Sequence, residues 1–97
     1  MNKIIYYPPA KKYFKKLKEK GLKEKYYNAI KEIEADYTVG TMKTGDLLGI
    51  YGYDIYYNSI NYEIAYKVEE LEDGTIVIII MAGTRENFYN ELKRYLK

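Results

Sequence analysis

The stretch TIVIIIMA at residues 75–82, followed directly by GTRENFY at residues 83–89, is the part of the sequence that decides the fold. Residues 75–82 are apolar at successive positions, which is typical of a central strand buried on both faces. The run is far shorter than the roughly 20 apolar residues that span a bilayer. Thr84 is a suitable N-cap, so we expect Arg85 and Glu86 to begin a C-terminal helix.

Three more strands are predicted upstream of this one. Residues 62–68 alternate apolar and polar side chains, as in a strand with one buried face. Residues 47–57 form another predicted strand, with Gly49 and Gly52 as points of bulge or close approach. Residues 2–7 are short, β-branched and aromatic, and two prolines end them. All four strands are expected to lie in one sheet.

Two helices are predicted between the first strand and the rest. Pro9 is a suitable first helical residue, and the apolar spacing that follows indicates an amphipathic helix. Gly21 is expected to end it, and residues 22–35 repeat the pattern. Residues 36–46 show no regular spacing of apolar side chains and are expected to form a loop. The prediction is a single α+β domain, residues 1–97, of order β-α-α-β-β-β-α, with a helical hairpin packed on a four-stranded antiparallel sheet.

The composition limits the chemistry. The chain has no cysteine, so it can form neither a disulfide nor a thiolate metal site. It also has no histidine, the side chain that most often acts as a general acid or base. Any catalysis must use Lys, Arg, Tyr, Asp or Glu. The N-terminal residues offer no apolar run long enough for a secretory signal. We therefore expect a cytoplasmic protein that is not inserted in a membrane.

Charge is distributed unevenly along the chain. Residues 1–31 hold ten lysines against two acidic residues, a local charge of +8, whereas residues 32–97 sum to −6. This asymmetry indicates either an anionic partner or simply a solvated lysine-rich helix surface. Seven of these ten lysines are the candidates for contact with an anionic partner: Lys11, Lys12, Lys15, Lys16, Lys18, Lys23 and Lys25.

Tyrosine is unusually frequent, with fourteen residues and no tryptophan. A tyrosine ring can stack on bases while its hydroxyl bonds to phosphate, but tyrosine is also a good strand residue. Four tyrosines lie on apolar periods and are expected in the core: Tyr13, Tyr26, Tyr62 and Tyr66. In residues 51–57, alternation requires some of the tyrosines to face solvent or a ligand.

Several of these segments together resemble the RelE/ParE family of bacterial toxins. They are LLGIY at residues 47–51, NYEIAYKV at residues 61–68 and the ending IIMAGTRENFY at residues 79–89, in the same strand and helix order. The resemblance covers nearly the whole chain. It implies a RelE/ParE-like domain.

The ribonuclease branch of this family cuts messenger RNA, typically at the ribosome, without a metal. The resemblance therefore implies no cofactor, and messenger RNA, the ribosome and a cognate antitoxin as partners. By position, Arg85 would stabilise the phosphate, and Tyr89 would act as base, acid or stacking platform. Tyr89 would need a cationic neighbour to act as a base, because an ordinary tyrosine has a pKa near 10. Tyr56 is a further catalytic candidate, and Tyr53 an RNA-binding candidate.

The sequence also departs from the family pattern. The second strand usually presents basic residues, yet here residues 53–57 read YDIYY, and Glu63 stands where the third strand usually has arginine. Asp54 and Glu63 would repel phosphate. Lys43 and Lys67 could replace the missing cations, the RNA could sit differently, the activity could be lost, or an acidic residue could serve as general base beside Arg85.

Two functions follow as hypotheses. One is a type II toxin that inhibits translation as a ribosome-dependent messenger RNA endonuclease. In this hypothesis the helix lysines, chiefly Lys11, Lys12, Lys15 and Lys16, bind ribosomal RNA phosphates. The alternative is a catalytically degenerate protein of the same fold that acts by protein binding. It would inhibit a host factor or gyrase, or act as a regulatory module.

Overall fold

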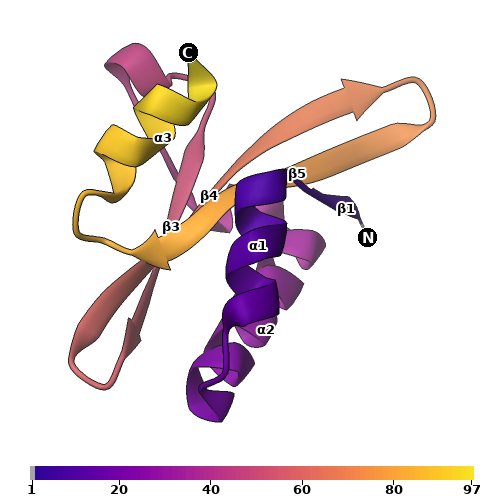
Figure 1. Cartoon of the computed structure of the whole chain (residues 1–97). Coiled ribbons are helices and arrows are strands. Elements are labelled where there is room, and N and C mark those ends of the chain that lie inside the picture. Colours follow the sequence, from indigo (N-terminus) through magenta and orange to yellow (C-terminus); the bar gives the residue numbers. More distant parts are fainter. Residues whose placement is uncertain (1) are drawn as a thin grey trace.

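A computed structural model describes residues 2–97 of the chain. Its five strands form one sheet in the order β1-β5-β4-β3-β2 (Figure 1). The strands are β1 (Lys3–Tyr6), β2 (Thr41–Met42), β3 (Tyr51–Tyr57), β4 (Ile60–Leu71) and β5 (Gly74–Thr84). The helices are α1 (Pro8–Lys16), α2 (Lys20–Ala35) and α3 (Phe88–Leu96), with short 3-10 turns at Tyr37–Val39 and Gly45–Leu47.

The predicted α+β class, the N-terminal helices on a sheet and the C-terminal helix are confirmed, but the sheet itself differs from the prediction. It is mixed, because β1 pairs with β5 in parallel after the two helices cross over the sheet. It has a fifth strand, because Thr41 and Met42 pair with Gly52 and Tyr51 of β3. The loop expected over residues 36–46 is therefore wrong at Thr41 and Met42, because two residues are too few for periodicity to reveal a strand.

The boundaries of the helical hairpin also differ. Gly21 does not end the first helix, which stops at Lys16 with an extended Leu17 as its C-cap. Gly21 instead lies in the first turn of α2. A Cβ there would collide with the hydroxyl of Tyr57. The glycine thus serves the contact of α2 with the tip of β3 rather than a helix stop.

The expected N-cap at Thr84 is wrong as well. β5 continues through Thr84, and the backbone N–H of Arg85 donates to the carbonyl of Asn61 at 3.0 Å, which extends the strand pairing. The helix begins only after Asn87, whose backbone is left-handed with a φ of 60°. Arg85 therefore lies in the bend between β5 and α3, not on a helix.

Side chains from both faces of the sheet are covered. On one face, α1 and α2 pack on a core that includes Tyr26, Ile33, Ile64, Tyr66 and Ile79. On the opposite face, a smaller core joins α3 to the sheet. This burial on both sides explains the continuous apolar run in β5.

The second core is smaller because α3 covers only one end of its face. Its members include Leu47, Ala65, Ile80, Phe88 and Leu92. The β3–β4 hairpin projects away from α3 in Figure 1. The sheet surface between α3 and that hairpin is where the charged residues gather.

The prediction for the core tyrosines is confirmed. Tyr26 and Tyr66 are buried, and Tyr13 and Tyr62 pack against the same core. Tyr66 stacks on Tyr51 with ring centroids 5.1 Å apart, an arrangement that favours a fixed sheet register. No helix within residues 2–97 is long and apolar enough to cross a membrane.

Candidate functional site

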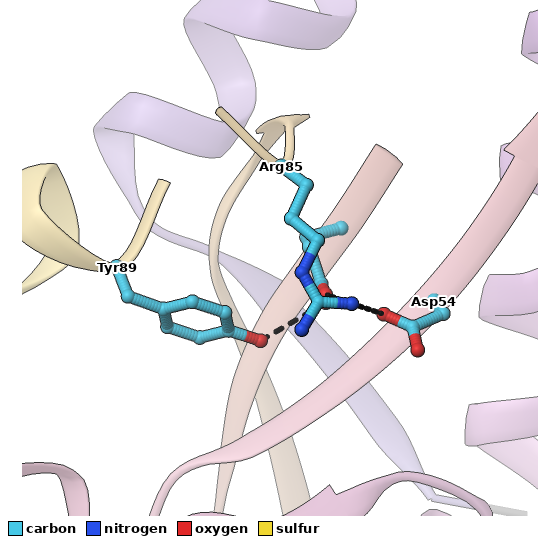
Figure 2. A network of polar contacts seen from close by, with 4 residues as sticks. Asp54, Arg85 and Tyr89 are labelled. Atoms are coloured by element: carbon cyan, nitrogen blue, oxygen red, sulfur yellow. Dashed lines mark hydrogen bonds and ion pairs between the residues drawn. The ribbon is translucent and has the colours of Figure 1, made fainter. Parts of the chain in front are cut away.

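Four side chains from four elements meet on the α3 face of the sheet. Asp54 of β3 and Glu63 of β4 are direct cross-strand partners, and Glu63 is also paired with Gly83 of β5. Arg85 follows β5 directly, and Tyr89 lies in the first turn of α3. Figure 2 shows the side chains of Asp54, Arg85 and Tyr89 converging.

Glu63 is the centre of this cluster. It is the one charged residue in the described part of the chain that is fully buried, at 0% exposure. Its Oε2 accepts a hydrogen bond from the Tyr89 hydroxyl at 3.0 Å, while its Oε1 has no hydrogen-bond partner within residues 2–97. Burial, and then the neighbouring Asp54, raise the pKa of Glu63 to about 7, against smaller opposing effects of Tyr89 and Arg85.

Arg85 bridges the two carboxylates. Its Nη1 lies 3.6 Å from Asp54 Oδ1 and 3.7 Å from Glu63 Oε1. The side chains of Arg85 and Asp54 are both more than half exposed, at 53% and 65%. The guanidinium therefore lies over the buried carboxylate and is itself open to solvent and to any anionic ligand.

Tyr89 is a proton donor in this arrangement. Burial, followed by the charge of Glu63 and its hydrogen bond, raises the pKa of Tyr89 well above its ordinary value. Arg85 opposes this shift but does not reverse it. The cationic neighbours thus fail to make Tyr89 a base at neutral pH.

Lys43 completes the cluster from the edge of the sheet. It follows β2, and its backbone N–H donates to the Ile50 carbonyl at 2.8 Å. Its Nζ lies 4.7 Å from the centroid of the Tyr89 ring, which is cation–π distance. Lys43 makes no ion pair with a carboxylate within the described residues, so its charge is not offset as that of Arg85 is.

Gly52 makes room for both groups. A Cβ at this position would lie 2.6 Å from the Tyr89 hydroxyl and 2.6 Å from Cε of Lys43. The close approach expected at Gly52 is therefore present, and its neighbours are the two side chains of the site. Gly49 lies outside the strand, in a turn with a φ of +95°.

Of the remaining strand candidates, Tyr53 and Lys67 lie apart from this cluster. Tyr53 faces α2, where its hydroxyl donates to Glu32 at 2.7 Å, and burial raises its pKa to about 12. Lys67 lies farther along β4, 5.4 Å from the ring centroid of Tyr7 and 3.8 Å from Glu69. Tyr56 shares a strand face with Asp54, two residues away, and is 64% exposed.

The helix lysines lie in the other layer of the molecule. Lys11, Lys15 and Lys23 line an apolar groove of about 500 Å³ between α1 and α2. Lys12 and Lys16 line a second groove, of about 480 Å³, beside the end of β5. All of them are exposed, and none contacts Glu63 or Arg85.

Sequence patterns gave no sign of two features of the site. Asn61, near the start of β4, accepts the backbone hydrogen bond of Arg85 and so determines where Arg85 lies. The burial of Glu63 could not be read either, because a lone glutamate in an alternating strand is ordinarily exposed. Within residues 2–97, no group of three His, Cys, Asp or Glu side chains is placed to hold a metal ion.

Comparisons with known proteins relate the chain to toxins of bacterial toxin–antitoxin systems. A family model described as a ParE-like toxin of type II bacterial toxin–antitoxin systems matches residues 4–93. The intact E. coli RelBE toxin–antitoxin complex contains a chain 19% identical, with a TM-score of 0.66, covering 86% of this chain and 95% of that one. A free double-arginine mutant of the E. coli toxin RelE is 18% identical, with a TM-score of 0.68, covering 95% and 92%. No curated protein matches the chain.

Proposed function

This chain belongs to the RelE/ParE superfamily of type II toxin–antitoxin toxins, and on that premise we propose that it is a metal-independent messenger RNA endonuclease acting at the ribosome. The observation that carries the proposal is Glu63. In a chain without histidine, it supplies a carboxyl group with a pKa of about 7, set beneath Arg85 and against Tyr89. A perturbed acid/base group among positioned donors is characteristic of a catalytic site.

The reaction needs three things from the protein. The ribose 2′-oxygen bonds to the adjacent phosphorus while the bond from phosphorus to the 5′-oxygen breaks. One group must take the 2′-OH proton, another must protonate the 5′-oxygen, and cations must stabilise the phosphorane charge. Glu63 is the base in this proposal, and Tyr89 is the acid because its raised pKa keeps it protonated. Arg85 and Lys43 are the cations.

Glu63 must become accessible for this step, because Arg85 lies over it. A phosphate competes with Asp54 and Glu63 for the guanidinium, and a charge-assisted bidentate contact to phosphate is stronger than either ion pair at 3.6–3.7 Å. Once Arg85 turns toward the phosphate, Oε1 of Glu63 is uncovered. That oxygen has no hydrogen-bond partner in the described residues and is free to accept the proton.

We also propose that this chain binds an antitoxin, as the related toxin does. E. coli RelE was crystallised in complex with its antitoxin. A cognate antitoxin is therefore proposed here, acting in the cytoplasm and masking the basic surface of α1 and α2. In the free toxin, Lys11, Lys12, Lys15 and Lys16 would contact ribosomal RNA phosphates, which requires no sequence recognition.

One observation favours the alternative, a toxin of the same fold that acts by binding a host protein such as gyrase. Asp54 and Glu63 offset the charge of Arg85, so Lys43 is the one cation of the cluster with no acidic partner among the described residues. A site of low net charge attracts phosphate less strongly than a basic one. The exposed ring of Tyr56, on the same strand face as Asp54, is suited to a protein interface.

Mapping of RNA 5′ ends after induced expression distinguishes the two functions. We expect new ends within coding sequences for the parent chain and none for Arg85→Ala at equal folded protein. A folded parent that arrests growth without new ends, and whose Arg85→Ala variant arrests growth equally, would overturn the nuclease and support the binding function. A folded parent with neither effect would contradict both.

A further inference from the structure

The sheet face that carries Asp54 and Glu63 continues beyond them toward the tip of the β3–β4 hairpin. Two residues farther along each strand, Tyr56 and Asn61 are again direct cross-strand partners. Side chains two apart in a strand point to the same face. Tyr56 and Asn61 therefore lie beside the Arg85 cluster on the end of the sheet that α3 leaves open.

Tyr56 contributes little to the fold. Its side chain is 64% exposed, and it makes no hydrogen bond, aromatic pair or cation–π contact within residues 2–97. Its neighbours Tyr53 and Tyr57 face the helices, where Tyr53 bonds to Glu32 and Tyr57 covers Gly21. The ring of Tyr56 is thus a flat apolar surface presented to solvent, on the strand face that also carries Asp54.

Asn61 connects this ring to the candidate reaction centre. Its carbonyl accepts the backbone N–H of Arg85 at 3.0 Å. Asn61 and Arg85 also line one open groove of about 360 Å³, together with Ser59, Ile60, Thr84 and Glu86. The side-chain amide of Asn61 offers both a hydrogen-bond donor and a hydrogen-bond acceptor. The edge of a nucleobase presents the complementary acceptor and donor groups.

We propose that Tyr56 and Asn61 form a binding site for one nucleobase of single-stranded RNA, with Tyr56 stacking on its face and Asn61 bonding to its edge. The site rests on the proposed nuclease function, whose phosphate lies at Arg85. Along β3, Tyr56 is roughly 7 Å from Asp54, at about 3.3 Å per residue, within reach of a base attached to that nucleotide. Tyr56 then binds substrate and takes no part in proton transfer.

A protein partner is the competing occupant of this surface. The flat ring of Tyr56 would suit either, but the groove at its cross-strand partner Asn61 is lined mainly by polar residues, including Arg85. Single-stranded RNA is recognised by that combination of a stacking ring, an edge-reading amide and a nearby cation. The observations therefore favour the nucleobase.

The test measures binding separately from cleavage. A short labelled RNA with 2′-O-methyl riboses cannot be cut, and its binding is followed by fluorescence anisotropy. We expect Tyr56→Ala to weaken binding roughly 5- to 150-fold, the range for loss of one base stack. Tyr56→Phe should keep most of the affinity. The matched control is Tyr27→Ala, because Tyr27 is 62% exposed but lies on α2 in the other layer.

The outcomes separate the site from the function. If the parent cuts RNA in cells and Tyr56→Ala binds and cuts as the parent does, the base site is wrong and the nuclease stands. A loss as large in Tyr27→Ala as in Tyr56→Ala would also overturn the site. If a folded parent neither binds nor cuts RNA while Tyr56→Ala loses a protein partner, both proposals fail and the surface is a protein interface.

Discussion

Tyr89 donates its hydroxyl hydrogen to Glu63 across 3.0 Å, which joins the first turn of α3 to β4. The contact couples two groups whose pKa values are both raised by burial. Near neutral pH the carboxyl is divided between its two protonation states, whereas the phenol remains protonated. The pair can therefore both accept and supply a proton without histidine.

Glu63→Gln is the substitution that tests this pair most directly. The glutamine amide keeps the size of the side chain and can still accept from Tyr89, but it cannot take a proton. We expect RNA cleavage to fall by about 10²–10⁴-fold, the usual contribution of a general base. Single-turnover cleavage with purified protein measures it. Unchanged cleavage by a folded Glu63→Gln protein would remove Glu63 from the mechanism.

The same residue predicts how stability changes with pH. Its pKa in the folded chain, about 7, is above the ordinary value of 4.5. Between these two values the native state binds more protons than the unfolded state, so the free energy of unfolding falls as pH rises. The stabilisation is complete below pH ~4.5 and is lost as pH rises through ~7, by roughly 3 kcal/mol at most. Urea unfolding at pH 5 and pH 8 measures the change.

Glu63→Gln is also the control for that experiment, because it has no carboxyl at this position to titrate. The difference in unfolding free energy between the parent and the variant should change with pH in the stated direction. If the unfolding free energies of the parent and the variant change equally from pH 5 to pH 8, Glu63 has an ordinary pKa in the folded protein.

Much of the fold was predictable because its signals are local. The apolar run in β5, the alternation in β4 and the amphipathic pattern of α1 each extend over enough residues to be recognised. The parallel pairing of β1 was not predictable, since strand direction depends on how the helices cross the sheet. The two-residue β2 was too short to give a pattern, and it is β2 that brings Lys43 to Tyr89.

The candidate site was only half predictable for a related reason. Arg85 and Tyr89 could be named from the resemblance, and the structure brings them together with Glu63. The burial of Glu63 depends on Gly83, Arg85 and Tyr89, which all lie in residues 83–89, far from Glu63 in the sequence. The side of the sheet on which Tyr53 lies could not be predicted, because period-2 alternation identifies two faces without telling which one the helices cover; the structure places Tyr53 against α2.

Asp54→Asn should change both the electrostatics of Glu63 and the binding of RNA. Asp54 raises the pKa of Glu63, so its removal should lower that pKa toward the ordinary value. It also frees Arg85 from one of its two ion pairs. We expect tighter binding of RNA and a pH–rate profile whose lower limb moves to lower pH. Weaker binding would mean that Asp54 positions Arg85 for the RNA.

Lys43→Met tests the cation without an acidic partner. Methionine keeps an unbranched apolar side chain near the Tyr89 ring and removes the charge. If Lys43 contacts a phosphate, the slope of log affinity against log salt should decrease in magnitude by about 1. Lys31→Met is a suitable control, because Lys31 lies on α2 over the ring of Tyr27, in a comparable cation–π contact at 5.8 Å. Equal slopes for parent and Lys43→Met would exclude the phosphate contact.

Gly52→Ala tests whether the space above the sheet positions Tyr89. The added methyl would meet the Tyr89 hydroxyl and Cε of Lys43 at 2.6 Å, so at least one of these side chains must move. Overpacking of this kind costs about 1–3 kcal/mol. If Tyr89 moves, its hydrogen bond to Glu63 is lost, and cleavage should fall at every pH while Lys43 still sets the salt dependence.

Thr41→Ala provides the matched control for Gly52→Ala, because Thr41 is the exposed cross-strand partner of Gly52 on β2. It alters the same strand pair without placing atoms in the site. If Lys43 moves instead, the flexible end of its side chain relieves the contact, Tyr89 keeps its bond to Glu63, and cleavage is nearly unchanged. Loss of cleavage in Gly52→Ala but not in Thr41→Ala would therefore place the strain on Tyr89, the side chain whose hydroxyl must stay in place to protonate the leaving oxygen.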